Sequence, residues 1–214
     1  MQVQIALFDG FDPLDVLGPY EVLLAGGGLS GGAVAVEFAA LDGPRTVPSG
    51  LPAVSLDATA TLDPTVDVLV VPGAVGAMSL DPAVEGSIGA RLARAGDLLV
   101  GTLRTALGHE GTTVATVCGG SLLLAWHGLA DGRPLVTHER GADLVGTAAV
   151  PVDARVVDDG DLVSAGNVTC GIDLALYLLE REVGPQVAHA VEQVVRFERR
   201  GTVWRAAGTA VKGA

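Results

Sequence analysis

The fold is decided by residues 113–126, which read Thr-Val-Ala-Thr-Val-Cys-Gly-Gly-Ser-Leu-Leu-Leu-Ala-Trp. The first five residues are apolar or β-branched, a composition typical of a buried strand. Residues 121–126 favour a short apolar helix that ends before Gly128. The two glycines between them permit a sharp turn from strand to helix. The pattern therefore predicts an elbow with Cys118 at its tip.

Similar alternation of strands and helices extends on both sides of this elbow. Strands are predicted at residues 3–8, 34–41 and 66–71, helices at 13–24, 88–107, 172–183 and 186–197, and hairpins at 48–56 and 155–164. The strands are continuously apolar, as strands covered on both faces are. We therefore expect an α/β sandwich with a mostly parallel central sheet.

The sequence also predicts how the chain is organised around this sheet. Asp12 is placed to cap the first helix, with Pro13 at its first position. The glycines of residues 26–32 are interpreted as a flexible connection after that helix. No internal linker is evident, so residues 1–204 are expected to form a single domain, and residues 205–214 a frayed tail.

Composition limits the classes of partner. The 214 residues include 25 acids against 13 bases, which gives a net charge of −12, so the surface repels nucleic acid and anionic lipid. Residues 111–130 carry no formal charge and are long enough to cross a bilayer, but their glycines, hydroxyl residues and His127 favour strand, turn and helix. The N-terminus has no basic leader, and two cysteines cannot form a disulfide framework. We expect a cytoplasmic protein with reduced thiols and no membrane partner.

Cys118 is the strongest candidate for chemistry. At the tip of a strand-to-helix elbow, its side chain is held clear of the backbone. The helix that follows directs partial positive charge and free N–H groups toward it, which favours the thiolate over the thiol. The alternative interpretation is a small buried residue with no reactivity. The turn favours the reactive thiol.

Several segments resemble the ThiJ/PfpI superfamily, which is related to class I glutamine amidotransferase domains. The resemblance lies in residues 117–125 (Val-Cys-Gly-Gly-Ser-Leu-Leu-Leu-Ala), 128–133, the pair Thr137-His138, and 71–73 (Val-Pro-Gly). Residues 11–22 (Phe-Asp-Pro-Leu-Asp-Val-Leu-Gly-Pro-Tyr-Glu-Val) and 166–173 (Gly-Asn-Val-Thr-Cys-Gly-Ile-Asp) resemble its isonitrile hydratase branch. The resemblance implies a flavodoxin-like three-layer sandwich.

The resemblance also implies a reaction and a set of site residues. Cys118 would add as a nucleophile to the isonitrile carbon of R–NC, and water assisted by Asp15 would convert the thioimidate to an N-substituted formamide. Backbone groups of Gly73, Ala74 and Gly119 would line the pocket as an anion-stabilising nest. No cofactor is implied. A homodimer is implied, with the first helix near its interface.

Other site residues follow from their place beside this pocket. His138 and Thr169 are expected to line it and bind substrate, and Cys170 is interpreted as a small buried residue that borders it. No group of His, Cys, Asp or Glu has the spacing of a metal site. The sequence departs from the branch's pattern at three positions: Gly119 replaces a hydroxyl residue, Ala74 a glycine, and Glu139 an aromatic residue.

Two alternatives to the hydratase remain open. The same Cys118, Asp15 and His138 would suit a glyoxalase- or deglycase-like enzyme acting on α-oxoaldehydes. A ligand- or redox-sensing module of the same fold would use the pocket without turnover. Turnover that depends on Cys118 separates both enzymes from the sensor.

Overall fold

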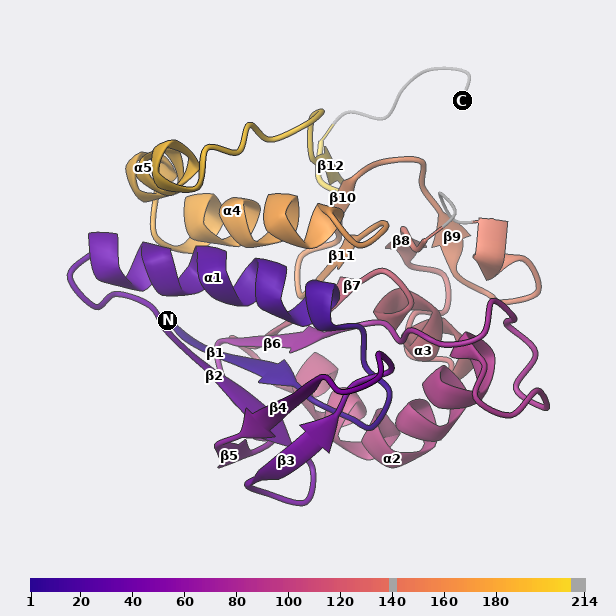
Figure 1. The fold of residues 1–214 in the computed structure, drawn as a ribbon. Coiled ribbons are helices and arrows are strands. Elements are labelled where there is room, and N and C mark those ends of the chain that lie inside the picture. Colours follow the sequence, from indigo (N-terminus) through magenta and orange to yellow (C-terminus); the bar gives the residue numbers. More distant parts are fainter. Residues whose placement is uncertain (139–141, 209–214) are drawn as a thin grey trace.

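The protein is built on one eight-stranded sheet, seen in a computed structural model that describes residues 1–138 and 142–208 (Figure 1). The strand order is β12-β10-β11-β7-β6-β1-β2-β5. In that order the strands are Trp204–Arg205, Val156–Asp158, Leu162–Ala165, Thr113–Val117, Val68–Val71, Gln2–Ala6, Ala35–Ala40 and Ala60–Thr61. Only β10 and β11 pair antiparallel within this sheet. The predicted mostly parallel sheet is confirmed.

Helices cover both faces of the sheet. Figure 1 shows α1 (Pro13–Leu29), α4 (Cys170–Glu182) and α5 (Pro185–Val195) on one face, and α2 (Ile88–Gly108) with α3 (Gly120–Trp126) on the other. The central strands β6 and β7 are buried along their whole length, because helices shield them on both sides. This arrangement is the predicted three-layer α/β sandwich.

The first helix is longer than predicted. We expected residues 26–28 to lie in a flexible connection, but α1 continues through them to Leu29. A Cβ at Gly26 would lie 2.5 Å from Leu179 Cδ2, and one at Gly27 would lie 2.4 Å from the carbonyl oxygen of Val34. These glycines serve close packing of α1 against α4 and against the chain entering β2. Packing therefore overrides their low helix propensity.

The shorter elements refine the predicted hairpins. The first has strands β3 (Arg45–Pro48) and β4 (Ser55–Ala58), so the predicted range 48–56 covers mainly its connection. The second, β10 to β11, turns at Gly160 with φ +84°. Two further strands, β8 (Pro134–Leu135) and β9 (Val150–Pro151), pair beside a 3-10 turn at Ala142–Leu144.

The C-terminal strand modifies the predicted tail. Trp204 and Arg205 pair with β10, so regular structure extends one residue into the range 205–214. Residues 209–214 lie outside the described residues.

The uncharged stretch 111–130 contains β7, the elbow and α3, as predicted. Within the described residues, no helix combines the length and apolarity needed to span a membrane.

Candidate active site

The elbow between β7 and α3 places Cys118 at the carboxyl edge of the sheet. Cys118 has φ +55°, in the left-handed region that residues other than glycine rarely occupy. Its N–H donates to the Ala165 carbonyl at 3.0 Å, which ties the elbow to β11. A Cβ at Gly120 would lie 2.2 Å from the Val71 carbonyl oxygen, so the turn requires glycine there. The predicted elbow is thus present, with strained geometry of the kind that clusters at functional sites.

Asp15 lies in the first turn of α1, behind this elbow. Asp12 caps the helix as predicted, accepting a hydrogen bond from the Leu14 N–H at 3.0 Å. The Asp15 side chain is fully buried, and its Oδ2 accepts from the Gly73 N–H at 2.9 Å. Its Oδ1 is also buried but has no hydrogen-bond partner among the described residues. A buried carboxyl group with an oxygen that has no partner is costly to ionise, so burial favours its protonated form.

Burial changes the proton affinity of both side chains. Loss of water, followed by the negative charge of Asp12, raises the pKa of Asp15 to about 8, although hydrogen bonds with Gly73 and Cys118 oppose the shift. Burial and the charge of Asp15 likewise raise the pKa of the Cys118 thiol far above its usual range, despite the Gly119 N–H. The Gly119 N–H at the helix N-terminus favours the thiolate, as expected, but burial and the charge of Asp15 outweigh it and raise the pKa. Both shifts favour the protonated form of the side chain.

A cavity of about 320 Å³ opens onto the Cys118 side chain. Cys118 itself is only 7% exposed. Most of the lining is apolar and comes from Val75, Leu80, Ile88, Leu92, Leu122 and Val168. Asp12 and Asp143 are the acidic side chains in the wall, and none of its described residues is Lys or Arg. The cavity therefore suits a small substrate with an apolar body and no negative charge.

The three predicted backbone groups have different roles. The Gly73 N–H is occupied by Asp15, so it positions the acid and is not available to a substrate. The Gly119 N–H donates toward the Cys118 sulfur. Ala74 lines the cavity, and its N–H has no hydrogen-bond acceptor among the described residues. Ala74 and Gly119 can therefore stabilise negative charge beside the sulfur.

Thr137 supports the elbow from outside the predicted set. Its buried hydroxyl donates to the Cys118 carbonyl at 3.0 Å. Sequence reasoning used Thr137 only as part of a motif, because a contact across 19 residues has no local pattern. The neighbouring His138 lines the Cys118 cavity, where it was expected.

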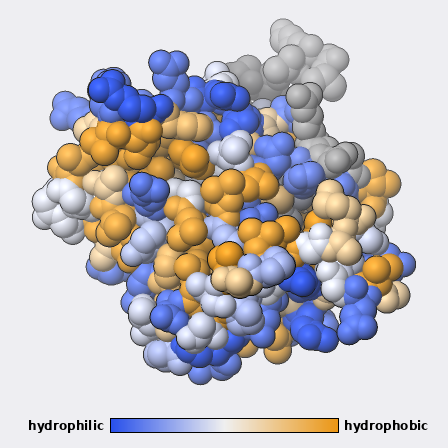
Figure 2. All heavy atoms as spheres, in the orientation of Figure 1, coloured by the Kyte–Doolittle hydropathy of each residue, from blue (hydrophilic) through white to orange (hydrophobic). Residues whose placement is uncertain are grey.

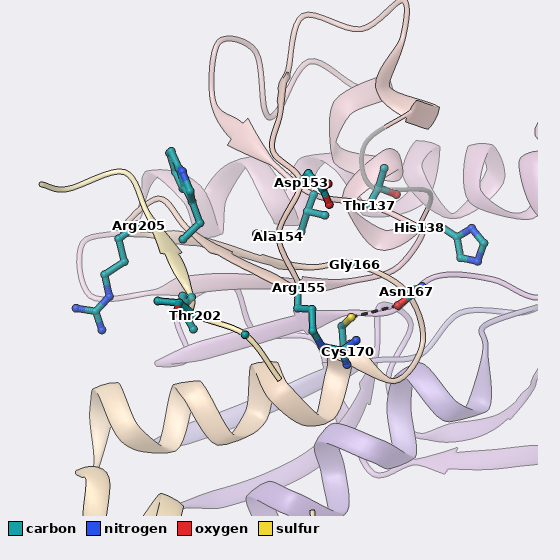
Figure 3. A pocket seen from close by; sticks show the side chains of 14 residues that line it. Thr137, His138, Asp153, Ala154, Arg155, Gly166, Asn167, Cys170, Thr202 and Arg205 are labelled. Atoms are coloured by element: carbon teal, nitrogen blue, oxygen red, sulfur yellow. Dashed lines mark hydrogen bonds between the residues drawn. The ribbon is translucent and has the colours of Figure 1, made fainter. Parts of the chain in front are cut away.

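Thr169 and Cys170 lie elsewhere. Thr169 is absent from the described lining of the Cys118 cavity, and its hydroxyl instead accepts a hydrogen bond from Arg155 at 3.4 Å. Cys170 is buried as expected, but it lines a different cavity, where its thiol donates to the Asn167 Oδ1 at 3.2 Å (Figure 3). Both residues were expected near Cys118 because residues 165–169 follow the carboxyl end of a predicted strand, where the reactive groups of such sheets gather. Cys170 thus lies on the other side of Thr137 and His138, which line both cavities.

The described residues contain no group of three His, Cys, Asp or Glu side chains that could hold a metal ion. Both cysteines are free thiols. The Cys118 site itself brings together a thiol, a carboxyl group whose pKa is raised by burial, and backbone N–H donors. Such a set can add sulfur to an electrophilic carbon and move one proton to the product of that addition.

Comparison with known proteins is consistent with this geometry. The chain is 34% identical over 202 residues to the isonitrile hydratase of Pseudomonas putida. This match covers 92% of this chain and 78% of that protein. Its fold matches a ThiJ/PfpI family protein from Pseudomonas syringae (TM-score 0.73, 22% identity, 94% of this chain and 76% of that one). It also matches Drosophila melanogaster DJ-1beta (TM-score 0.68, 24% identity, 92% and 98%). The model of the DJ-1/PfpI family matches residues 1–181. The chain therefore belongs to the DJ-1/PfpI family.

Proposed function

We propose that this protein is an isonitrile hydratase that works through a covalent bond to Cys118. The observation that carries the proposal is the pair formed by the Cys118 thiol, at a strained elbow facing an apolar cavity, and the buried carboxyl of Asp15. The 34% identity to an isonitrile hydratase over most of the chain supports the substrate class. The small apolar cavity is compatible with an uncharged R–NC.

The reaction follows from the protons that the pair holds. As Cys118 Sγ bonds to the isonitrile carbon, the thiol proton passes to Asp15 and the Asp15 proton passes to that carbon, giving the thioimidate R–N=CH–S–Cys118. Water then adds to the carbon while the nitrogen takes a proton. The C–S bond breaks, the hydroxyl proton returns to sulfur, and R–NH–CHO leaves. The net change is addition of one water to R–NC, with the pair restored.

Asp15 is suited to this exchange by its position. Asp15 does not itself line the cavity, but it interacts with the Cys118 side chain. It can therefore exchange protons with the sulfur and with a substrate carbon bonded to that sulfur. A carboxyl with a pKa of about 8 holds its proton at neutral pH yet releases it readily. The N–H groups of Ala74 and Gly119 would stabilise charge that develops on the adduct.

The test is turnover of benzyl isocyanide, followed by loss of its infrared stretch and by N-benzylformamide in the mass spectrum. The wild type is expected to produce the formamide, and Cys118→Ser to produce none. In a parallel arm, methylglyoxal is supplied without glutathione. Consumption of methylglyoxal alone would replace the hydratase with the glyoxalase-like alternative, and no turnover of either substrate would favour the sensing module.

We further propose that residues 1–204 act as one domain, in the cytoplasm, and pair as a homodimer through α1. Leu14, Leu17 and Leu24 repeat at helical spacing on α1 and are 48%, 39% and 53% exposed. Figure 2 shows apolar side chains gathered over this helix. Exposed apolar stripes of this kind favour a protein partner. Leu17→Glu with Leu24→Glu is expected to give a monomer in light scattering, where the wild type gives a dimer.

A further inference from the structure

A second cavity, of about 680 Å³, lies beside the Cys118 cavity and has no part in the proposed reaction. Its wall is formed by residues from four segments, 136–138, 153–155, 166–170 and 201–205. Thr137 and His138 line both cavities and so form the partition between them. Figure 3 shows Arg155 and Cys170 side by side in the wall, below Gly166 and Asn167. The volume is within the range of sites for small organic ligands.

Arg155 is the charged group best placed to bind a ligand in this cavity. Its Nε and Nη2 donate to Asp173 Oδ2, and Nη2 also donates to the Thr169 hydroxyl. Within the described residues no hydrogen bond uses its remaining nitrogen, Nη1. The Arg155 side chain is 28% exposed, whereas that of Asp173 is 4% exposed. The buried Asp173 carboxylate thus fixes the Arg155 guanidinium through Nε and Nη2, and it leaves Nη1 available to a ligand.

Asp173 is itself fully occupied by this arrangement. Its Oδ1 accepts from the Arg200 N–H at 3.0 Å, while its Oδ2 accepts from Arg155. Because both oxygens have partners inside the protein, the carboxylate has no need of a ligand, and the orientation of Arg155 is set before any ligand binds. Such preorganisation reduces the entropy lost on binding.

The two neighbouring cavities differ in charge. The described wall of the Cys118 cavity contains Asp12 and Asp143 and no Lys or Arg. The described wall of the second cavity contains Arg155, Arg205 and a single acid, Asp153. The Arg205 guanidinium lies over the Tyr177 ring at 5.4 Å, so Arg155 is the cation available for direct contact. Because Arg155 brings a guanidinium to this wall, whereas no described Lys or Arg lines the Cys118 cavity, the second cavity is the one of the two suited to an anion.

The remaining wall indicates the body of such an anion. Val136, Ala154 and Val203 supply apolar surface, and Trp204 supplies an aromatic ring. Asn167 and Thr202 add hydrogen-bonding groups. A carboxylate joined to an apolar or aromatic body would match this mixture, with the carboxylate on the free edge of Arg155.

We propose that the cavity beside Cys170 is a second ligand site, which binds a small organic carboxylate through Arg155. This site is separate from the Cys118 cavity and does not depend on the proposed hydratase activity. Three probes cover the class: benzoate, cyclohexanecarboxylate and indole-3-acetate. Benzamide is the uncharged match to benzoate. Calorimetric titration at low salt is expected to detect one bound carboxylate per chain, with benzamide about tenfold to a hundredfold weaker.

Matched variants locate the binding. Ala154→Phe fills the second cavity and is expected to abolish binding, whereas Val75→Phe fills the Cys118 cavity and is expected to leave it unchanged. Arg155→Lys keeps the charge beside Asp173 but loses the planar fork, and is expected to weaken binding about tenfold. Thermal melting checks that each variant folds, and Thr202→Phe is the second filling variant if Ala154→Phe does not fold.

The opposite results overturn the proposal. If none of the three carboxylates binds the wild type at millimolar concentration, the cavity is not a carboxylate site. Binding that survives both filling variants, or that is lost in Val75→Phe alone, would place the anion elsewhere. Equal affinity for benzoate and benzamide would show that Arg155 does not recognise the carboxylate charge.

Discussion

Replacing Asp15 by Asn is expected to stabilise the protein at neutral and alkaline pH while it abolishes most of its activity. Asp15 is fully buried, and its pKa rises from 3.8 to about 8 on folding. Between these two values the folded protein holds a proton that the unfolded chain has released. The free energy of unfolding must therefore fall as pH rises through this window. Asn keeps an oxygen for the Gly73 N–H and does not ionise.

The size of the effect follows from the same window. Each unit of pH within it removes about 1.4 kcal/mol from the wild type's free energy of unfolding. Over the interval from 3.8 to about 8, the sum is on the order of 6 kcal/mol. The difference between Asp15→Asn and the wild type should therefore be small near pH 4, grow through neutral pH, and level off above pH 8.

Urea unfolding at a series of pH values measures this difference directly. Glu21→Gln is the matched control, because Glu21 is an exposed acid on the same helix, and its curve should run parallel to that of the wild type. The reasoning about Asp15 would be refuted if Asp15→Asn also ran parallel to the wild type from pH 5 to pH 8. If Asp15→Asn gained stability with rising pH but turned over as fast as the wild type, Asp15 would hold a buried proton that takes no part in catalysis.

Three further predictions concern the pair, the elbow and the first helix. The wild type's kcat/KM should decline above pH about 8, since Asp15 then loses the proton that the proposed reaction passes to the isonitrile carbon; a flat profile to pH about 9.5 would contradict this. Thr137→Val should lower kcat about tenfold with little change in KM, because the hydrogen bond to the Cys118 carbonyl is lost. Thr137→Ser keeps a hydroxyl and should retain activity. Equal kcat in both variants would exclude a positioning role for Thr137. Gly27→Ala should destabilise the protein by about 1–3 kcal/mol, because its Cβ would meet the Val34 carbonyl oxygen. Gly28→Ala, which meets nothing within 4 Å, should stabilise it by about 0.5–1 kcal/mol in the same chemical denaturation assay.

The features that sequence predicted well are those encoded within a few residues. The elbow depends on a β-branched strand, two glycines and an apolar helix, all within residues 113–126, and its tip is Cys118 with φ +55°. The cap at Asp12 likewise rests on a contact two residues away. Local sequence is sufficient where the turn or cap is itself local.

The features that sequence missed depend on contacts between distant segments. Gly26 and Gly27 were assigned to a connection because their role is close packing against Leu179 and Val34, which local propensity does not register. The pKa of the Cys118 thiol was expected to fall, since the helix that follows it is visible in the sequence whereas the burial that raises it is not. Thr169 was placed beside Cys118 for a similar reason, because the direction of the turn into α4 depends on tertiary structure.

The central claim is that Cys118 forms a covalent bond to substrate with the help of the Asp15 proton. Intact-mass spectrometry of protein quenched in acid during turnover of benzyl isocyanide tests it most directly. The account predicts a species heavier by the mass of one isocyanide, mapped to Cys118 by peptide analysis and absent from Cys118→Ser. Formamide production without any adduct, or an adduct at Cys170 and none at Cys118, would contradict it.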